Sequence, residues 1–181
     1  MASALLVAAL ALATAGCREW PGRGPADARP PAPAAVPARE AAPAWVGDAV
    51  DLGGRGYGEH LRIAVLGQVD PAVPARATAA EPPAGTRRIG ARLSVLNFGG
   101  RPFDASRART WVEDADGRRH RPVATGTLTT GRPLAWNTLA VGEQRDGWLV
   151  YQVPERARIV RLHCAAGGRT VSWQLRFPPR G

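Results

Sequence analysis

The chain has 181 residues, enough for one domain of ordinary size or for a smaller domain with a tail. Its net charge of +9 comes from 24 Arg and no Lys against 15 acidic residues, and the absence of C-x-x-C and H-x-x-x-H spacings argues against a zinc site. Residues 18–60 hold five Arg and six acids, whereas residues 61–181 hold nineteen Arg and nine acids. A basic region of this kind attracts anionic partners, although scattered Arg with abundant Ala, Gly and Pro is also typical of a GC-rich genome.

The N-terminus predicts export. The apolar run in "ALLVAALALATAGC" is about a dozen residues long, too short for a bilayer span of roughly 20, and fits a signal peptide over residues 1–17. Its end, Thr14 to Cys17, resembles the lipobox of bacterial lipoproteins, and this resemblance implies a lipid attached to Cys17. Thr14 stands where that motif usually has Leu, and no basic residue precedes the run. The alternative is plain secretion.

A Pro-rich and then Gly-rich stretch follows over residues 18–59. Seven prolines lie between residues 18 and 45, with few large apolar side chains. Such a segment buries too little surface to offset its ordering entropy, so we expect a disordered tether with polyproline II character. The segment "GDAVDLGGRGYGEH" (47–60) is interpreted as its last part.

From residue 60 to residue 178 the hydrophobic period is two, which predicts strands. Asp116-Gly117 is a typical tight hairpin turn, and "GWLVYQVP" (147–154) has apolar residues on both faces, as a central strand covered by a loop does. About seven or eight strands with no helix of any length predict an all-β, antiparallel β-sandwich. The positions expected to face inward are Leu61, Ile63, Val65, Ile89, Ala91, Leu93, Val95, Val160, Leu162, Cys164, Val171, Trp173, Leu175 and Phe177.

Several of these segments resemble the DUF4352 family. The similar pieces are the strand ending "LSVLNFGGRPFD", the hairpin "WVEDADGRRH", the run "LAVGEQRDGWLVYQVP" and the closing "VSWQL". The resemblance covers about residues 60–177 and implies an immunoglobulin-like, MPT63-like sandwich from a secreted bacterial lipoprotein. Arg101-Pro102 departs from the small polar residues that the family often has there. The family has no defined catalytic residues, so the resemblance implies none.

The residues themselves do not indicate a reaction. No serine sits in a G-x-S-x-G elbow, and His163 and Cys164 are neighbours that point to opposite faces of a strand. We interpret Cys164 as a buried, inert thiol. "EDADG" (113–117) matches the start of a calcium loop but lacks the later ligands, and the hairpin turn explains the same residues. We therefore expect no catalytic residue, no metal and no cofactor.

Two surfaces are candidates for binding. The first is the basic hairpin with Arg118, Arg119 and Arg121, and the second is the loop "TGRPLAWNT", which contains Trp136. The alternative interpretations are a solvated turn for the arginines and a lid over the edge of the sandwich for Trp136. Nucleic acid is not expected as a partner, because the aromatic residues are predicted to face inward and the protein to be exported.

These observations favour a non-catalytic binding or structural module. We expect it on the extracellular face of the cell membrane, held by its lipid anchor, and in contact with a protein or an anionic cell-wall polymer. Secretion without an anchor is the alternative location. The alternative function is a secreted protease inhibitor that presents the loop near Arg132-Pro133 to an active site.

Overall fold

The computed structural model describes residues 42–54, 56–76 and 81–176. Cys17, the predicted signal peptide, most of the predicted tether and Phe177 lie outside the described residues. No helix among the described residues is long and apolar enough to cross a membrane.

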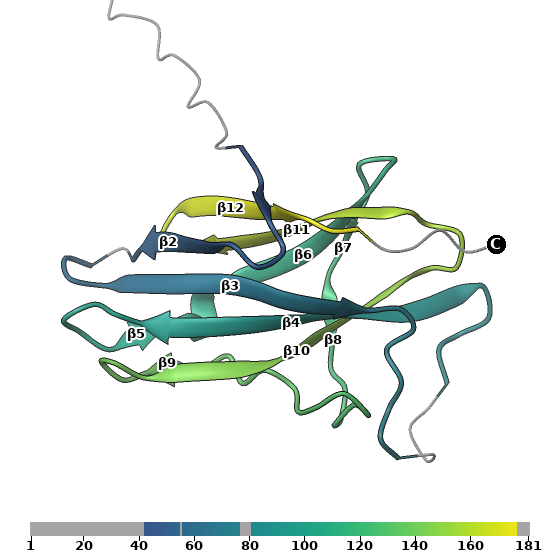
Figure 1. The fold of residues 1–181 in the computed structure, drawn as a ribbon, viewed down its shortest axis with the longest axis horizontal. Helices are drawn as coiled ribbons and strands as arrows, with labels where there is room; N and C mark the ends of the chain where they lie inside the picture. Colours follow the sequence, from purple (N-terminus) through teal and green to yellow (C-terminus); the bar gives the residue numbers. More distant parts are fainter. Residues whose placement is uncertain (1–41, 55, 77–80, 177–181) are drawn as a thin grey trace, which may run out of the picture. The chain divides into compact units, whose positions relative to one another are not determined.

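The described residues form two five-stranded sheets and a short two-stranded one (Figure 1). The first sheet has the order β1 (Ala44–Trp45), β12 (Arg169–Gln174), β11 (Ile159–Ala166), β6 (Arg109–Asp114) and β7 (Arg119–His120). The second has the order β2 (Ala49–Gly53), β3 (His60–Val69), β4 (Thr86–Asn97), β10 (Gln144–Pro154) and β8 (Pro122–Val123). The two-stranded sheet pairs β5 (Phe103–Asp104) with β9 (Thr138–Leu139), and a 3-10 turn, η1, spans Ala105–Arg107. Apart from the parallel pair of β1 and β12, the paired strands are antiparallel, which confirms the predicted β-sandwich.

The core lies between the two five-stranded sheets. Nearly all of the described residues expected to face inward are buried. Val171 is only partly buried, and so is Val160, because the pairing of β11 with β6 shifts its register between Ile159 and Arg161. Trp173 and Tyr151 are the largest side chains with no exposed surface. Side chains that alternate along a strand point to opposite faces of the sheet, so the period of two in the sequence sorts them into core and surface.

Strand β10 is central, as predicted. It pairs with β4 over its whole length and with β8 on its other side. Leu149, Tyr151 and Val153 face the main core. Trp148 and Val150 face the other way and form a second, smaller core with Ala72 and Leu128 from covering loops.

The predicted boundary of the tether at residue 59 is wrong. Strands β1 and β2 lie inside it, and Leu52 is completely buried. The indole N–H of Trp173 donates to the carbonyl of Asp48 at 3.1 Å, so this segment is part of the sandwich. Five residues of β2, next to Gly and Pro, are too few to show a period by themselves. With β1, β2 and the further short strands β5, β8 and β9, the number of strands in the described residues is twelve.

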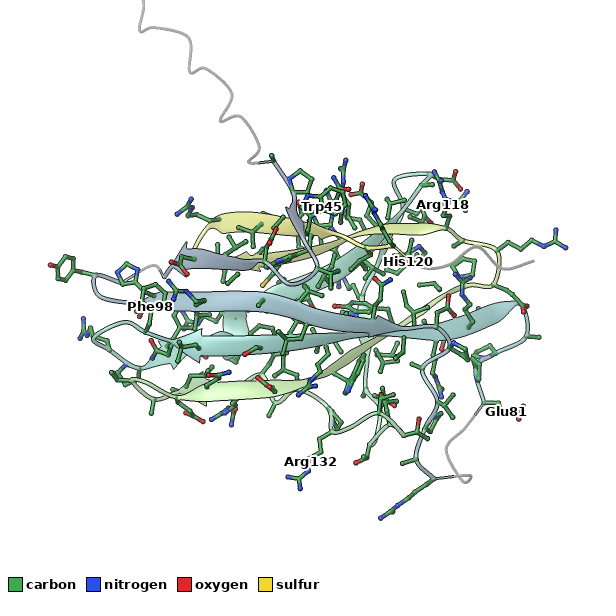
Figure 2. All side chains as sticks on the ribbon, viewed as in Figure 1. Trp45, Glu81, Phe98, Arg118, His120 and Arg132 are labelled. Atoms are coloured by element: carbon green, nitrogen blue, oxygen red, sulfur yellow. The ribbon has the colours of Figure 1, made fainter. Side chains whose placement is uncertain are left out.

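The predicted hairpin turn at Asp116-Gly117 is confirmed. Gly117 has φ of 79°, in the left-handed region that glycine adopts without strain. The turn joins β6 to β7, and Arg118 at its tip is labelled in Figure 2.

Candidate functional site: a basic cleft at one end of the sandwich

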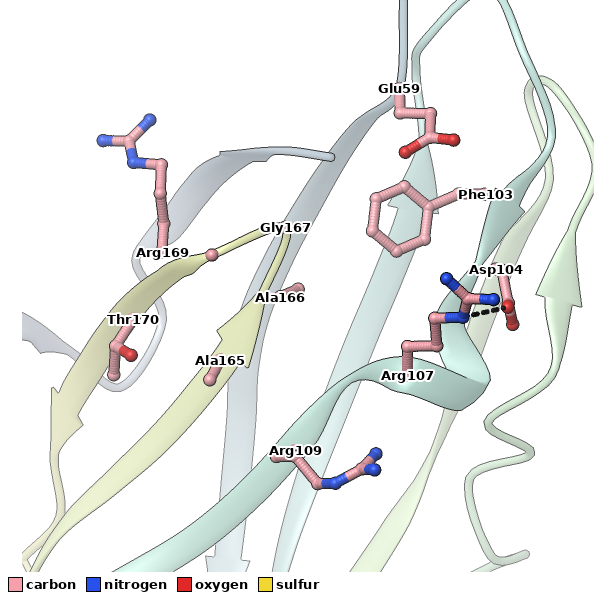
Figure 3. Close-up of a pocket in the computed structure, with 11 residues that line it drawn as sticks. Glu59, Phe103, Asp104, Arg107, Arg109, Ala165, Ala166, Gly167, Arg169 and Thr170 are labelled. Atoms are coloured by element: carbon pink, nitrogen blue, oxygen red, sulfur yellow. Dashed lines mark ion pairs between the residues drawn. The ribbon is translucent and has the colours of Figure 1, made fainter. Parts of the chain in front are cut away.

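An open cleft of about 820 Å³ lies at one end of the sandwich (Figure 3). Its apolar lining is Phe103, Ala165 and Ala166, of which Phe103 and Ala166 also belong to the main core. The charged side chains that line it are Glu59, Asp104, Arg107, Arg109 and Arg169. They come from the β2–β3 loop, from β5 with the turn that follows it, and from the strands β6 and β12.

Close backbone contacts hold the loops around the cleft. Gly167, in the β11–β12 turn, has φ of 59°, and a Cβ built there would lie 2.1 Å from the carbonyl oxygen of Gly53. Only glycine allows that approach. The turn is therefore packed against the end of β2, which places Arg169 beside the β2–β3 loop.

Asn97 ties two further loops together. Its side chain, which is completely buried, donates to the carbonyls of Arg101 at 2.8 Å and Leu139 at 3.1 Å, and accepts from the N–H of Gly99 at 3.0 Å. Asn97 thus bonds backbone groups of two loops at the point where the chain leaves β4. Because Phe103 follows closely along this loop, Asn97 helps to position one wall of the cleft.

Both carboxylates of the cleft already have partners within the protein. Asp104 accepts from the hydroxyl and N–H of Ser106 and pairs with Arg107 at 3.2 Å. The hydrogen bond from the Ser106 hydroxyl, with smaller contributions from that N–H and from Arg107, holds the pKa of Asp104 below its usual value. Glu59 accepts from the N–H of Gly56 at 3.0 Å and so stabilises the turn of its own loop.

Two of the three arginines lack a carboxylate partner among the described residues. Arg109 donates only to carbonyl oxygens, at 3.3 Å from that of Ser106 and 3.1 Å from that of Ala108. Arg169 is exposed, and its guanidinium has no hydrogen bond or ion pair to any described residue. The cleft therefore presents open cations together with apolar side chains, an arrangement suited to an anionic group with an apolar neighbour.

The predicted basic hairpin is a different region. Arg118, Arg119 and Arg121 are all exposed, but the guanidinium of Arg119 stacks over the ring of Trp111, 5.1 Å from its centroid. Beneath the turn, the buried Asp114 accepts from the N–H groups of Asp116 and Arg118 at 3.0 and 2.9 Å. Several polar groups of this hairpin therefore form hydrogen bonds within it and stabilise its turn.

Asp114 also binds His120, with 2.9 Å between the carboxylate and Nε2. Burial raises the pKa of Asp114, but the hydrogen bonds from His120 and the two N–H groups of the turn outweigh it, and the pKa is lowered. Within "EDADG", Asp114 therefore stabilises the turn, whereas Glu113 belongs to β6 and lies 3.2 Å from His163. No group of three or more His, Cys, Asp or Glu that could hold a metal occurs among the described residues.

Trp136 packs against the main core and is only partly exposed. This placement matches the lid interpretation, in which the indole covers the edge of the sandwich. Trp136 is not among the residues that line the cleft.

The free Cys164 is fully buried, as expected. Burial raises the pKa of its thiol to about 12, so the thiolate does not form at neutral pH. Its neighbour His163 lies on the opposite face of the sheet, where its ring stacks on Trp111 with centroids 5.0 Å apart and lies 3.2 Å from the Glu113 carboxylate. The structure therefore does not bring His163 and Cys164 together.

The cleft itself was not found from the sequence. Arg107 and Arg109 are close in sequence, but Arg169 is far from both, and no local motif joins the three. The only signals were the glycine pairs at residues 53–54, 99–100 and 167–168, which in retrospect mark loops that pack backbone to backbone at one end.

The comparisons with known proteins agree with this fold. The family described as "Domain of unknown function (DUF4352)" matches residues 65–170. The structure is similar to the secreted protein MPT63 of Mycobacterium tuberculosis, with 16% identity, a TM-score of 0.54, and coverage of 75% of this chain and 100% of that one. An uncharacterised β-sandwich protein of Clostridium difficile 630 matches with 12% identity, a TM-score of 0.47, and coverage of 75% and 95%.

No curated protein sequence gives a significant match to the chain. At 16% identity, the likeness to MPT63 shows the fold alone. The family match, in contrast, spans more than half of the chain and includes the hairpin, strand β10 and strand β11. The protein therefore belongs to the DUF4352 family.

Proposed function

We propose that the protein is a non-catalytic binding module, and that the basic cleft is its binding site for an anionic ligand. One observation carries this proposal: the two carboxylates of the cleft already have partners, whereas Arg109 and Arg169 have no carboxylate partner among the described residues. An unpaired guanidinium is an efficient receptor for a carboxylate or a phosphate. The cleft volume of about 820 Å³ falls within the range of roughly 300–1,000 Å³ for ligand sites.

The location belongs to the same proposal. We place the protein outside the cell membrane, with a signal peptide over residues 1–17, a lipid on Cys17, and a tether that ends before β1. The lipobox-like sequence supports this, and so does the description of MPT63 as a secreted protein. Cells fed an alkyne fatty acid should label the wild-type chain and not Cys17→Ala. Equal labelling of both chains would contradict the anchor.

Binding is tested with two soluble polyanions, poly-L-glutamate for carboxylates and inorganic polyphosphate for phosphates. The full chain is titrated with each one, and the double variant Arg109→Ala/Arg169→Ala is compared with wild type. We expect at least about a tenfold loss of affinity, because both open cations of the cleft are removed.

The control has the same net charge as that variant. Arg132→Ala/Arg156→Ala removes two exposed arginines that do not line the cleft; Arg132 is labelled in Figure 2. Its affinity should stay within about twofold of wild type. Equal losses in the two double variants would mean that net charge alone drives binding, and this would overturn the cleft as the site.

The alternative function, protease inhibition by the loop near Arg132-Pro133, has less support. The carbonyl of Arg132 and the N–H of Leu134 are both hydrogen-bonded to the backbone of Trp148, at 2.9 Å each. An inhibitory loop has to offer its backbone to the protease, whereas this one is held flat against β10.

A further inference from the structure

Three large, exposed apolar side chains lie at the same end of the sandwich as the cleft. Tyr57, in the β2–β3 loop, is 97% exposed, Phe98, after β4, is 43% exposed, and Val141, before β10, is 54% exposed. Figure 1 shows that these three connections share one end of the sandwich, and Phe98 is labelled there in Figure 2. We call Tyr57, Phe98 and Val141 the loop-end patch.

The loops that carry the patch are bonded to one another. The N–H of Phe98 donates to the carbonyl of His60 at 3.2 Å, and the N–H of Gly100 donates to the carbonyl of Gly58 at 3.0 Å. A Cβ at Gly99 would lie 2.3 Å from that same Gly58 oxygen, so the two loops touch through their backbones. The backbones of these two loops are thus held in place before any partner binds, which reduces the ordering cost of binding.

The loop that carries Val141 is hydrogen-bonded to the residue just before Phe98. Asn97 donates its N–H to the carbonyl of Glu143 at 2.9 Å, and its carbonyl accepts from the N–H of Gly142 at 2.8 Å. Asn97 directly precedes Phe98, so the turn that carries Val141 lies beside the Phe98 loop. Phe98 is also held by Arg62, whose guanidinium lies 5.0 Å from the ring centroid and is paired with Asp51 at 2.8 Å.

The patch is continuous along the chain with the cleft. Tyr57 and Glu59 belong to one loop, and Phe98 and Phe103 lie at the two ends of another. A further cation, Arg101, is exposed between them and has no hydrogen bond or ion pair from its guanidinium to any described residue. This end of the molecule therefore combines exposed aromatic and aliphatic side chains with arginines that lack a carboxylate partner.

We propose that the anionic partner of the cleft is a protein segment that carries both acidic and apolar side chains. This inference rests on the proposed function. A phosphate or carboxylate polymer would use the arginines alone and leave the loop-end patch in water. Tyr and Arg are enriched at the centres of protein interfaces, where they carry much of the binding energy. An acidic side chain of the segment lies in the cleft, and its apolar side chains pack on Tyr57 and Phe98.

The test uses random peptides displayed on phage and selected on the full chain. Selection should enrich peptides in which Asp or Glu stands near aromatic or aliphatic residues. The affinity of a selected peptide should fall at least about tenfold in Tyr57→Ala and in Phe98→Ala. Leu66→Ala and Val73→Ala are matched controls, because these side chains are 44% and 47% exposed but lie away from the cleft, and their affinity should stay within about twofold.

Two results would overturn the inference. One is a selection that yields no peptides combining acidic and apolar residues. The other is a selected peptide whose affinity does not depend on Tyr57 and Phe98. In either case, a loss of poly-L-glutamate or polyphosphate binding in Arg109→Ala/Arg169→Ala would leave the proposed function standing with a polymer as the partner. If Arg109→Ala/Arg169→Ala binds both polyanions as tightly as wild type does, the proposed function itself fails.

Discussion

The basic hairpin and the basic cleft are both rich in arginine, but their charged side chains have different partners. In the hairpin, Arg119 stacks on Trp111, and Asp114 binds the turn and His120. In the cleft, the carboxylates are the groups that serve the loops, and Arg109 and Arg169 keep their charge without a carboxylate partner among the described residues.

This difference shows why a local count of arginines is a poor guide to a binding site. "GRRHR" is the densest basic cluster in the folded part of the sequence, yet it does not line the cleft: Arg119 stacks on Trp111, and Arg118 and Arg121 are exposed on the hairpin. The cleft arginines come from two distant parts of the sequence, Arg107 and Arg109 in one and Arg169 in the other, and meet only through the fold. What matters for an anionic ligand is which cations without an acceptor the fold gathers in one cleft.

The largest expected effect comes from Asn97, on which the loops at the cleft end depend. Asn97→Ala should lower the free energy of unfolding by about 3 kcal/mol, because it removes three hydrogen bonds and leaves buried backbone groups unsatisfied. Urea denaturation measures the change. Asn137→Ala, at an exposed position, is the control and should stay within about 0.5 kcal/mol. A loss below about 1 kcal/mol at Asn97 would show that the loops do not depend on it.

A smaller effect is expected at the hairpin. Asp114→Asn should lower the free energy of unfolding by about 2 kcal/mol, since hydrogen bonds to a charged, buried group are each worth roughly 1.5–3 kcal/mol and the amide retains part of them. Because the folded protein holds the pKa of Asp114 below its unfolded value, its contribution is present above about pH 4 and is lost as the pH falls through the folded pKa.

Denaturation at neutral pH and at about pH 3 separates the two contributions. The difference between wild type and Asp114→Asn should shrink at the lower pH, because the carboxyl in the unfolded chain, with its ordinary pKa of about 3.9, is mostly protonated there. If the difference were the same at both pH values, the charge of Asp114 would not be what stabilises the turn.

The smallest effect is expected at the tip of the hairpin. Arg118→Ala/Arg121→Ala should change the free energy of unfolding by less than about 0.5 kcal/mol, because both side chains are exposed. The affinity of this double variant for poly-L-glutamate should stay within about twofold of wild type. A loss larger than that of Arg109→Ala/Arg169→Ala would make the hairpin, and not the cleft, the main anion site.

Much of the sandwich could be predicted because long strands repeat their pattern. β3, β4 and β10 each have several consecutive inward positions, so the buried face is visible in the letters. β1 and β2 were missed because two and five residues next to Gly and Pro show no usable period, and their burial depends on Trp173 and β3. Trp136 had two interpretations for a similar reason, since a single indole in a loop has no neighbours in sequence that show which way it faces.

The sequence by itself was therefore enough to determine the class of fold, the central position of β10, the hairpin turn at Gly117 and the burial of Cys164. Each of these depends on local alternation of side chains or on the conformational range of one residue. The cleft and the loop-end patch depend on contacts between loops that are distant in sequence, such as Gly167 against Gly53 and Gly99 against Gly58. Which charged side chains have a partner depends on their positions in three dimensions. The packing of the two sheets sets those positions, because it brings the loops together at one end.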